Sequence, residues 1–362
     1  MRPGAAEVPL QVERDLRAIL ASLPDHHSRL TEVCAQVEDW PALLAAARDH
    51  GLASVVLAAA RRARVPASVI KADAVTQELR LGAVWQDILR DTVRNALTAL
   101  EQREVPAVAL KGPLLAARLY DDEIVRISTD VDLLVAPASI DQAVLALRPL
   151  GYELEGGAVG RFYRSYHHHV HLLHPTLPPL ELHFEAYRGF GTVLPAAPLL
   201  GRSITCAVPG WGQVRVLSPE DEFVYLAVHA ASHRFQRLLW LFDLKLHVLR
   251  HASLRWEDVA MCAKAHRVSA AVSFACQLLS DWLDVPAAGS IALPTLAEAR
   301  FHAARYLARR QPIHVVNAAA DLFFSTLLCD NASRRVELWE RFVRMKISHD
   351  APLRLRALFS SQ

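Results

Sequence analysis

Apolar positions in the first hundred residues recur at the spacing of an α-helix. Leucine and isoleucine at positions 16, 19, 20 and 23 fall on one helical face, and a longer periodic segment covers residues 76–103. The texture is helical throughout this part of the chain. We therefore expect residues 1–103 to form an N-terminal helical region.

The pattern changes after residue 104. The run Val105–Leu110 is apolar without interruption, as in a buried strand, and it ends at residues 111–113. Pro113 suits the first position of a helix, so residues 114–120 are expected to be helical. Asp130–Val135 alternates and then becomes apolar, which predicts a second strand.

Turn residues divide the following segment into short elements. Ser139 and Gln142 match a capping box that would open a helix through residue 147. Two strands joined by a turn and one hairpin are then expected, with the strands at Arg161–Leu173, Leu180–Tyr187, Ile204–Val208 and Gln213–Leu217.

A second helical stretch begins at residue 218. Ser218 is expected as an N-cap and Pro219 as the first helical residue, with acidic residues in the first turn. Helical periodicity then continues to about residue 358, with a loop at Pro286–Pro294. The prediction is an α+β fold in which a small mixed β-sheet core, residues 104–217, lies between the N-terminal helices and a C-terminal helical domain, residues 218–362.

Composition favours a cytoplasmic protein. Hydrophobic residues make up 52% of the 362 residues and the mean hydropathy is +0.16. The longest apolar runs, such as Leu52–Ala60, are too short to span a bilayer, and residues 1–12 have no apolar core of the signal-peptide type. We expect no membrane partner.

Charge and cysteine usage exclude further classes. The 40 basic and 38 acidic residues nearly cancel, so net charge does not indicate a nucleic-acid partner, although local charge leaves one open. The five cysteines form no CxxC pair, so neither a disulfide framework nor a thiolate zinc site is expected.

The strand that begins at Asp130 carries the first candidate chemistry. Asp130 and Asp132 are two residues apart, so their carboxylates project from the same side of a strand. Such a pair repels unless a cation lies between its members, and Mg²⁺ prefers carboxylate oxygens. A solvated strand edge remains the alternative for a DxD pattern alone.

A two-metal site needs a third carboxylate from a neighbouring strand. Glu181 is the best candidate, because Glu181, His183 and Glu185 would share one face of the strand at Leu180–Tyr187. By itself, Glu181 is better explained as an exposed strand position.

A phosphate-binding element is expected upstream of the aspartates. Lys111 and Gly112 follow a buried strand and open a helix, where backbone N–H groups favour anions. Gly112 allows close backbone approach, and Lys111 supplies a point charge. The order of a P-loop is absent.

Together these segments resemble a known family. The strings LKGPLLAARLY, RISTDVDLLV, LELHFE, LSPEDEFVYLAVHAASH and LLWLFDLKL occur in this order. They are similar to the uncharacterised bacterial nucleotidyltransferase family of the polymerase-β-like superfamily. The resemblance covers about Val105–Leu249, and it rests on the ordered set rather than on any single motif.

The resemblance implies a set of roles. Asp130 and Asp132 would bind the metal with Glu181 as the third acidic residue, and Lys111 and Gly112 would handle the triphosphate. Arg126 would support the triphosphate or orient the acidic pair. Characterised superfamily members carry Gly-Ser or Gly-Gly where this chain has Lys-Gly-Pro.

Several histidines are candidates for other roles. His167, His169 and His171 would share one face of a strand and His168 the other, so a zinc site is conceivable, whereas His183 is expected to contact substrate near Glu181. Three further candidates for substrate contact have packing alternatives: His229, His233 and Asp243.

His229 and His233 have the i, i+4 spacing of a zinc pair, but the intervening glutamate of a metalloprotease is missing. Asp243, in an apolar helix, needs an arginine or histidine partner if it is buried. The structural role is favoured for Asp243.

The predicted function is metal-dependent transfer of a nucleoside monophosphate from an NTP to an unknown acceptor. The cofactor would be Mg²⁺ or Mn²⁺, and the acceptor a small molecule, a peptide, a protein or RNA. A toxin-like activity on tRNA is one variant of this enzyme hypothesis. The alternative is a degenerate nucleotidyltransferase fold that binds nucleotides or regulates.

Overall fold

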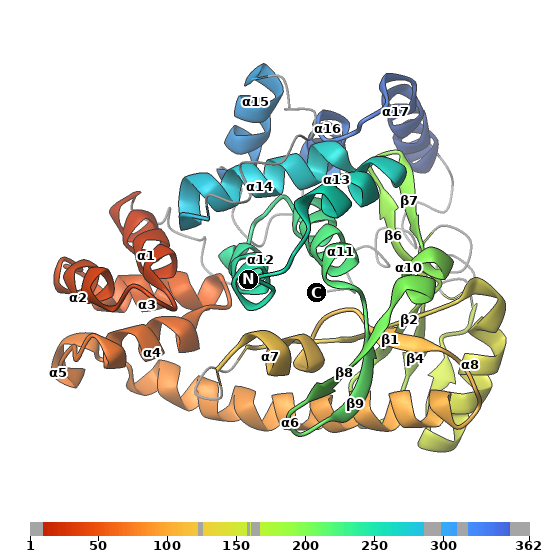
Figure 1. Ribbon diagram of the computed structural model, residues 1–362, viewed down its shortest axis with the longest axis horizontal. Coiled ribbons are helices and arrows are strands. Elements are labelled where there is room, and N and C mark those ends of the chain that lie inside the picture. Colours follow the sequence, from red (N-terminus) through yellow and green to blue (C-terminus); the bar gives the residue numbers. More distant parts are fainter. Residues whose placement is uncertain are drawn as a thin grey trace.

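The N-terminal part of the computed structural model is a group of short helices. The structure describes residues 10–121, 126–157, 160, 167–285, 298–309 and 318–347. The first helices, on the left of Figure 1, are α1 (Leu10–Ser22), α2 (His27–Ala35), α3 (Trp40–Asp49), α4 (Ala53–Arg62) and α5 (Ala67–Ile70). The helical reading of this region is confirmed over the described residues.

Helix α6 (Asp73–Glu101) is long and runs along the lower edge of Figure 1. Its second half buries Leu89, Val93, Ala96 and Leu100, a 4-3-4 spacing that forms one stripe. This stripe belongs to the same hydrophobic cluster as the strands. Helix α6, placed by sequence in the N-terminal region, therefore supports the β-sheet.

The main sheet has five strands in the order β1-β2-β5-β4-β3. Only β2 and β5 are parallel; the other neighbours are antiparallel. The strands are β1 (Ala107–Ala109), β2 (Val131–Val135), β3 (Glu153–Leu154), β4 (His169–Leu173) and β5 (Leu180–His183). The small mixed sheet predicted from the sequence is confirmed.

The two faces of this sheet differ in chemistry. Val131, Leu133 and Leu182 point to the side that packs against α6 and α8 (Ile140–Leu147). Alternate residues, among them Asp132 and Glu181, point to the other side. The second face is mixed: Leu134 and Val108 pack there against the helical core, and the polar residues lie beside them.

The structure corrects two of the expected elements. Ser139 makes no capping bond, because the short 3₁₀ turn Pro137–Ser139 precedes α8, and Gln142 instead donates to the carbonyl of Arg103. The strand expected at Leu180–Tyr187 is broken at Phe184, whose N–H and that of Glu185 both donate to His168 O.

After the break the chain forms a separate ribbon. Strand β6 (Glu185–Gly189) pairs with β7 (Thr192–Pro195), so Glu185 leaves the face of Glu181 and pairs with Arg188. The first part of the other expected strand, residues 161–166, lies outside the described residues. Helix α10 (Ala196–Arg202) and the predicted hairpin, β8 (Ile204–Val208) with β9 (Gly212–Val216), follow.

The C-terminal helices begin as predicted, with Ser218 accepting a bond from the N–H of Asp221 and Pro219 at the first position. The helices are α11 (Pro219–Ser232), α12 (Leu238–Arg250), α13 (Trp256–Ala265), α14 (Ser269–Leu283), α15 (Glu298–Arg309), α16 (Ala318–Leu327) and α17 (Ala332–Ile347). The expected loop at 286–294 and the tail beyond 347 lie outside the described residues.

The helical flanks pack together. Helices α1–α4 share one hydrophobic core with α11–α14. Inside it the ammonium of Lys245 donates to the carbonyls of Leu20, Ala21 and Leu283, at 2.9, 2.7 and 3.1 Å. The C-terminal ends of α1 and α14 are thereby joined, since their carbonyls lack helical partners.

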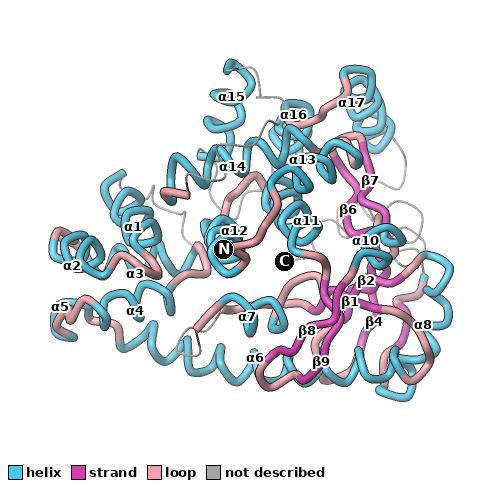
Figure 2. Tube along the Cα trace, in the orientation of Figure 1, coloured by secondary structure: helices cyan, strands magenta, loops and turns pink. Residues whose placement is uncertain are grey.

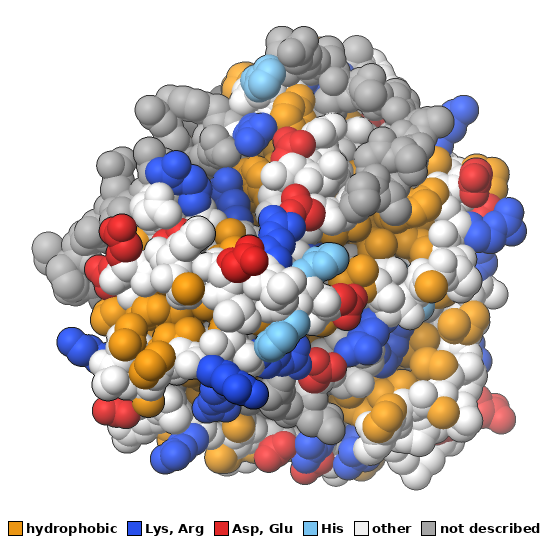
Figure 3. All heavy atoms as spheres, turned by 60° about the vertical axis from the view of Figure 1, so that its left-hand side comes forward, with side chains coloured by type: hydrophobic (Ala, Val, Ile, Leu, Met, Phe, Trp, Pro, Cys, Tyr) orange, Lys and Arg blue, Asp and Glu red, His pale blue; other side chains and the backbone are white. Residues whose placement is uncertain are grey.

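The strands gather on the right of Figure 2, between α8 and the helices that fill the left and upper parts of the view. Among the helices of the described ranges, none combines the length and apolarity needed to cross a bilayer. On the face drawn in Figure 3, basic and acidic side chains are interspersed. This distribution agrees with the near-zero net charge.

Candidate active site

Five polar side chains lie on one face of the main sheet. Asp132 on β2 is opposite Glu181 on β5. On the other side of β5, His171 is opposite Glu181, and His169 is opposite His183. Directly paired residues share a face, so β2, β5 and β4 together present an acidic and imidazole-rich row.

Asp130, Asp132 and Lys111 meet at one end of this row. The Lys111 Nζ atom lies 3.2 Å from Asp130 Oδ2 and 3.0 Å from Asp132 Oδ2. Burial opposes the charged lysine, but the two aspartates outweigh it and hold the pKa of Lys111 well above its ordinary value. A cation is therefore stabilised between the two carboxylates.

Local backbone geometry brings Lys111 to this position. Gly112 has φ +80 and ψ −145, a conformation that is open to glycine and strained for other residues. The chain then enters α7 (Pro113–Leu119), with Pro113 at its first position as predicted.

Glu181 extends the site toward the histidines. Ligand atoms of Asp132, Glu181 and His183 lie within 4.8 Å of one another. His183 Nε2 is 3.0 Å from Asp132 Oδ1 and 3.4 Å from Glu181 Oε2. Glu181 thus faces the same side of the sheet as Asp132, as the sequence predicts, with His183 between them.

Burial and neighbouring charges shift the pKa values of Asp132 and His183. Burial, with the nearby Asp130 carboxylate, raises the pKa of Asp132 to about 6 against the opposing charge of Lys111. Burial also opposes protonation of His183, but bonds to Asp132 and Glu181 raise its pKa to about 9. At neutral pH His183 is therefore a proton donor.

The remaining histidines lie on the far side of Glu181. His169 Nε2 and His171 Nε2 are 3.1 Å apart, and His171 Nδ1 is 3.1 Å from Glu155 Oε2. Burial, reinforced by His183, holds the pKa of His169 well below its ordinary value, so this ring is neutral.

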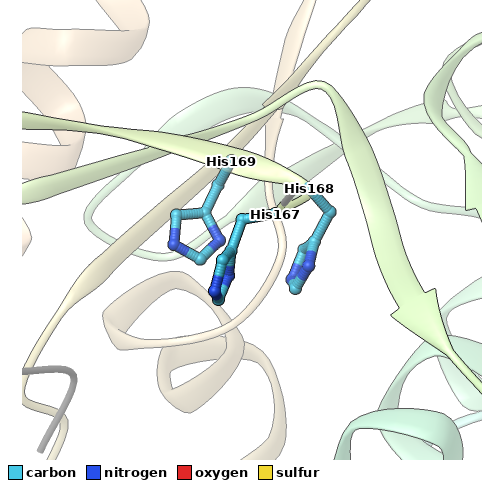
Figure 4. A group of neighbouring side chains, drawn as sticks. All are labelled: His167, His168 and His169. Atoms are coloured by element: carbon cyan, nitrogen blue, oxygen red, sulfur yellow. The ribbon is translucent and has the colours of Figure 1, made fainter. Parts of the chain in front are cut away.

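The histidine run departs from the predicted alternation. His167 and His168 precede β4 in a bend, and Figure 4 shows the rings of His167, His168 and His169 projecting toward the same side of the chain. The His168 ring lies 4.9 Å from that of His169 and 5.2 Å from that of His183. His168 therefore joins the polar side of the sheet instead of the opposite one.

Helix α11 contributes a further histidine. His229 Nε2 is 3.4 Å from Lys111 Nζ, and the pKa of His229 is lowered by burial and by the lysine charge. The ring of His233 lies 4.9 Å from that of His229 but is exposed. Only His229 reaches the group around Lys111 through a described polar contact.

Arg126 and Asp243 form a buried pair instead of facing the site separately. Arg126 Nε and Nη2 donate to the two carboxylate oxygens of Asp243 at 2.8 and 2.6 Å, and Nη1 donates to Ser128. The hydroxyl of Tyr120 donates to Asp243 at 2.6 Å. Of the two roles expected for Arg126, this geometry favours orientation of the segment that leads to Asp130.

Two residues that contribute to the site were not predicted from the sequence. Glu155 lies just beyond β3 and reaches the site only because its backbone extends the pairing with His171. Gln86 on α6 holds both the N–H and the carbonyl of Ser128, at 3.1 and 2.9 Å. Neither residue lies in a motif, so no sequence signal marks them.

A second buried ion pair fixes α7 and gives a pH prediction. Arg118 binds both carboxylate oxygens of Glu222 at 2.7 and 2.8 Å, and His247 Nε2 lies 3.2 Å away. Burial opposes the ionised carboxylate, yet His247 and Arg118 lower the pKa of Glu222 to about 2. This pKa lies below the ordinary value of 4.5, so the stabilisation is complete above that pH and is lost as pH falls toward 2.

We therefore expect the wild type to lose on the order of 2 kcal/mol more unfolding free energy between pH 6 and pH 3 than Glu222→Gln loses. Urea denaturation of both proteins across this range measures the difference. Parallel curves for the two proteins would contradict the assignment.

Comparison with known proteins identifies the family of the chain. A family model described as uncharacterised nucleotidyltransferase matches residues 36–284, more than half of the chain, which confirms the predicted resemblance and extends it on both sides. The solution structure of the antibiotic-resistance factor ANT(2'')-Ia is similar at 17% identity and a TM-score of 0.34, covering 51% of this chain and 91% of that one. Among curated proteins, no match is found.

Proposed function

Since this chain belongs to the uncharacterised nucleotidyltransferase family, we propose that it moves a nucleoside monophosphate from an NTP to an acceptor in a Mg²⁺-dependent reaction. One observation carries the proposal. Oxygens of Asp130 and Asp132 converge on a single cation position, which the Lys111 ammonium fills at 3.2 and 3.0 Å. A pair of carboxylates that holds one cation in this way suits a divalent one better, because both negative charges are then balanced.

The donor set fits Mg²⁺. Asp130 and Asp132, which share the Lys111 cation, would hold the ion through carboxylate oxygens, and Glu181, grouped with Asp132 and His183, would be the third acidic ligand. Mn²⁺ would serve with the same ligands. When bound, the metal neutralises phosphate charge and stabilises the charge that develops on the attacking and leaving oxygens.

The chain's own residues supply the remaining chemistry. The acceptor atom forms a bond to the α-phosphorus as the bond to the pyrophosphate breaks, and pyrophosphate leaves with the electron pair. Glu181 or Asp132 takes the acceptor proton. His183, which lies 3.0 Å from Asp132 and 3.4 Å from Glu181, would orient these carboxylates, and His229 lies close enough to Lys111 to line the same space.

Lys111 and Gly112 are proposed to handle the triphosphate. Lys111 would leave the aspartates when the metal enters and would then meet a phosphate as a point charge. Asp243 and Arg126 stay outside the substrate contacts, because their polar atoms already bind one another. The exposed His233 remains a candidate for the acceptor side.

The binding test compares wild type with Asp130→Ala/Asp132→Ala by isothermal titration with Mg²⁺ and each NTP. We expect the wild type to bind at least one NTP in the presence of Mg²⁺ and the variant to bind it far more weakly. Equal binding and equal turnover in both proteins would remove the basis of the proposal.

Lys111 offers a separate test of the cation position. Lys111→Met removes the charge that competes with the metal, so the affinity for Mg²⁺ without nucleotide should rise by about tenfold, or about 1.4 kcal/mol. The transfer rate should fall, because the phosphate contact is lost. Titration of Mg²⁺ into the nucleotide-free proteins measures the first effect, with Lys264→Met, on α13, as a control.

The Lys111 position also favours a second candidate function. A lysine bound by both aspartates could replace the metal permanently in a degenerate fold that only binds nucleotide. The two functions differ in two results: such a module binds NTP without Mg²⁺, and it releases no pyrophosphate with any acceptor.

A further inference from the structure

A second group of ligand atoms lies beside the aspartates, on the far side of Glu181. It consists of His169 Nε2, His171 Nε2 and the Glu181 carboxylate. The two ring nitrogens are 3.1 Å apart, and they lie 3.8 and 3.5 Å from the nearer Glu181 oxygens. Cross-strand pairing between β4 and β5 sets this triangle, so it is built by the sheet and not by a loop.

The triangle has the size of one face of a tetrahedral metal shell. With bonds of about 2.0–2.1 Å to nitrogen and oxygen, neighbouring ligand atoms of a tetrahedral zinc ion are about 3.3 Å apart. The three observed separations bracket this value. Entry of an ion would require only small adjustments of side chains.

The position of Glu155 independently indicates that His171 could bind a metal. Its Oε2 atom is 3.1 Å from His171 Nδ1, on the opposite side of the ring from the triangle. A neutral His171 that donates its Nδ1 proton to Glu155 presents the lone pair of Nε2 to the triangle. This carboxylate behind a ligating histidine is the usual outer partner of protein-bound zinc.

We propose that His169, His171 and Glu181 bind a divalent transition metal of the Zn²⁺ class, with Glu155 orienting His171. Two imidazoles and one carboxylate suit zinc and its neighbours, whereas Mg²⁺ requires oxygen ligands. The predicted zinc candidates were histidines alone; the geometry replaces His167 with Glu181.

This site is distinct from the proposed Mg²⁺ position but adjoins it. Glu181 belongs to both groups, and His183 bridges Glu181 to Asp132. The transition metal would fix Glu181 and so order the third acidic ligand of the reaction. Binding of the transition metal does not depend on nucleotidyl transfer, so a metal-binding measurement alone tests the proposed site.

The experiment titrates ZnCl₂ into the full chain, freed of metal, against a chromophoric chelator. We expect one Zn²⁺ per chain, with Mg²⁺ unable to displace it. His171→Ala should weaken Zn²⁺ binding by more than about 100-fold, and Glu155→Gln, which keeps all three ligands, by about 10–100-fold.

Three controls make the result decisive. His27→Ala removes an exposed histidine on α2 and should bind Zn²⁺ as the wild type does, as should Asp130→Ala. Far-ultraviolet circular dichroism verifies that each variant is folded. Wild-type affinity for Zn²⁺ in both His171→Ala and Glu155→Gln would overturn the proposal. The proposal would also fail if His167→Ala lost Zn²⁺ binding and His171→Ala kept it, because the metal would then belong to the preceding histidines.

Discussion

Asp132→Asn is expected to lower the rate of NMP transfer by about 10³-fold, equivalent to about 4 kcal/mol of lost transition-state stabilisation. The side chain of Asp132 is almost fully buried, and it contacts both Lys111 and His183. Asparagine keeps the shape but removes the charge that would hold the metal. The change therefore acts on charge and not on packing.

Pyrophosphate release with saturating Mg²⁺ and NTP measures this loss. Asp25→Asn, an exposed carboxylate between α1 and α2, removes one charge far from the sheet and should leave the rate unchanged. In Asp132→Asn, Lys111 loses one of its two carboxylate partners and is freer to contact a phosphate. NTP binding should therefore fall less than the transfer rate. A rate within tenfold of the wild type would show that Asp132 does not hold the catalytic metal.

The positions of the acidic residues were accessible from sequence because strand periodicity determines them. Alternation places Glu181 and His183 together on one side of β5, and Asp130, which precedes β2, meets Asp132 through Lys111. Parallel pairing of β2 with β5 then puts Asp132 beside Glu181. A two-residue period is enough to predict this row.

The same rule failed where regular pairing ends. His168 does not follow the strand alternation, because it lies in a bend before β4. The expected strand at Leu180–Tyr187 is interrupted at Phe184, where two consecutive N–H groups donate to the carbonyl of His168. Both departures involve the backbone of a second segment. Periodicity in one segment carries no information about such a partner.

The sequence also did not predict which distant segments contact one another. The apolar stripe of α6 indicates a helix, but not that the helix packs on the sheet while α1–α4 join the C-terminal helices. A buried Asp243 predicts a cationic partner, but its choice of Arg126 depends on tertiary structure. Sequence thus predicted the kind of contact and left its partner open.

Asp243→Ala is expected to reduce the free energy of unfolding by about 3–5 kcal/mol, because it leaves the Arg126 guanidinium buried without a counter-charge. The two side chains are 5% and 2% exposed, and Tyr120 also loses its acceptor. Urea denaturation at pH 7 measures the change. Asp87→Ala, which breaks the exposed Arg90–Asp87 pair, should cost no more than about 1 kcal/mol.

The double change Arg126→Met/Asp243→Leu separates stability from positioning. It removes both charges and should recover much of the lost stability, since apolar pairs of similar volume replace buried ion pairs well. Transfer activity should remain low, because Ser128 then keeps Gln86 but loses the Arg126 bond that holds the approach to Asp130. Full recovery of activity together with stability would mean that the pair serves folding alone, and that β2 positions its aspartates without it.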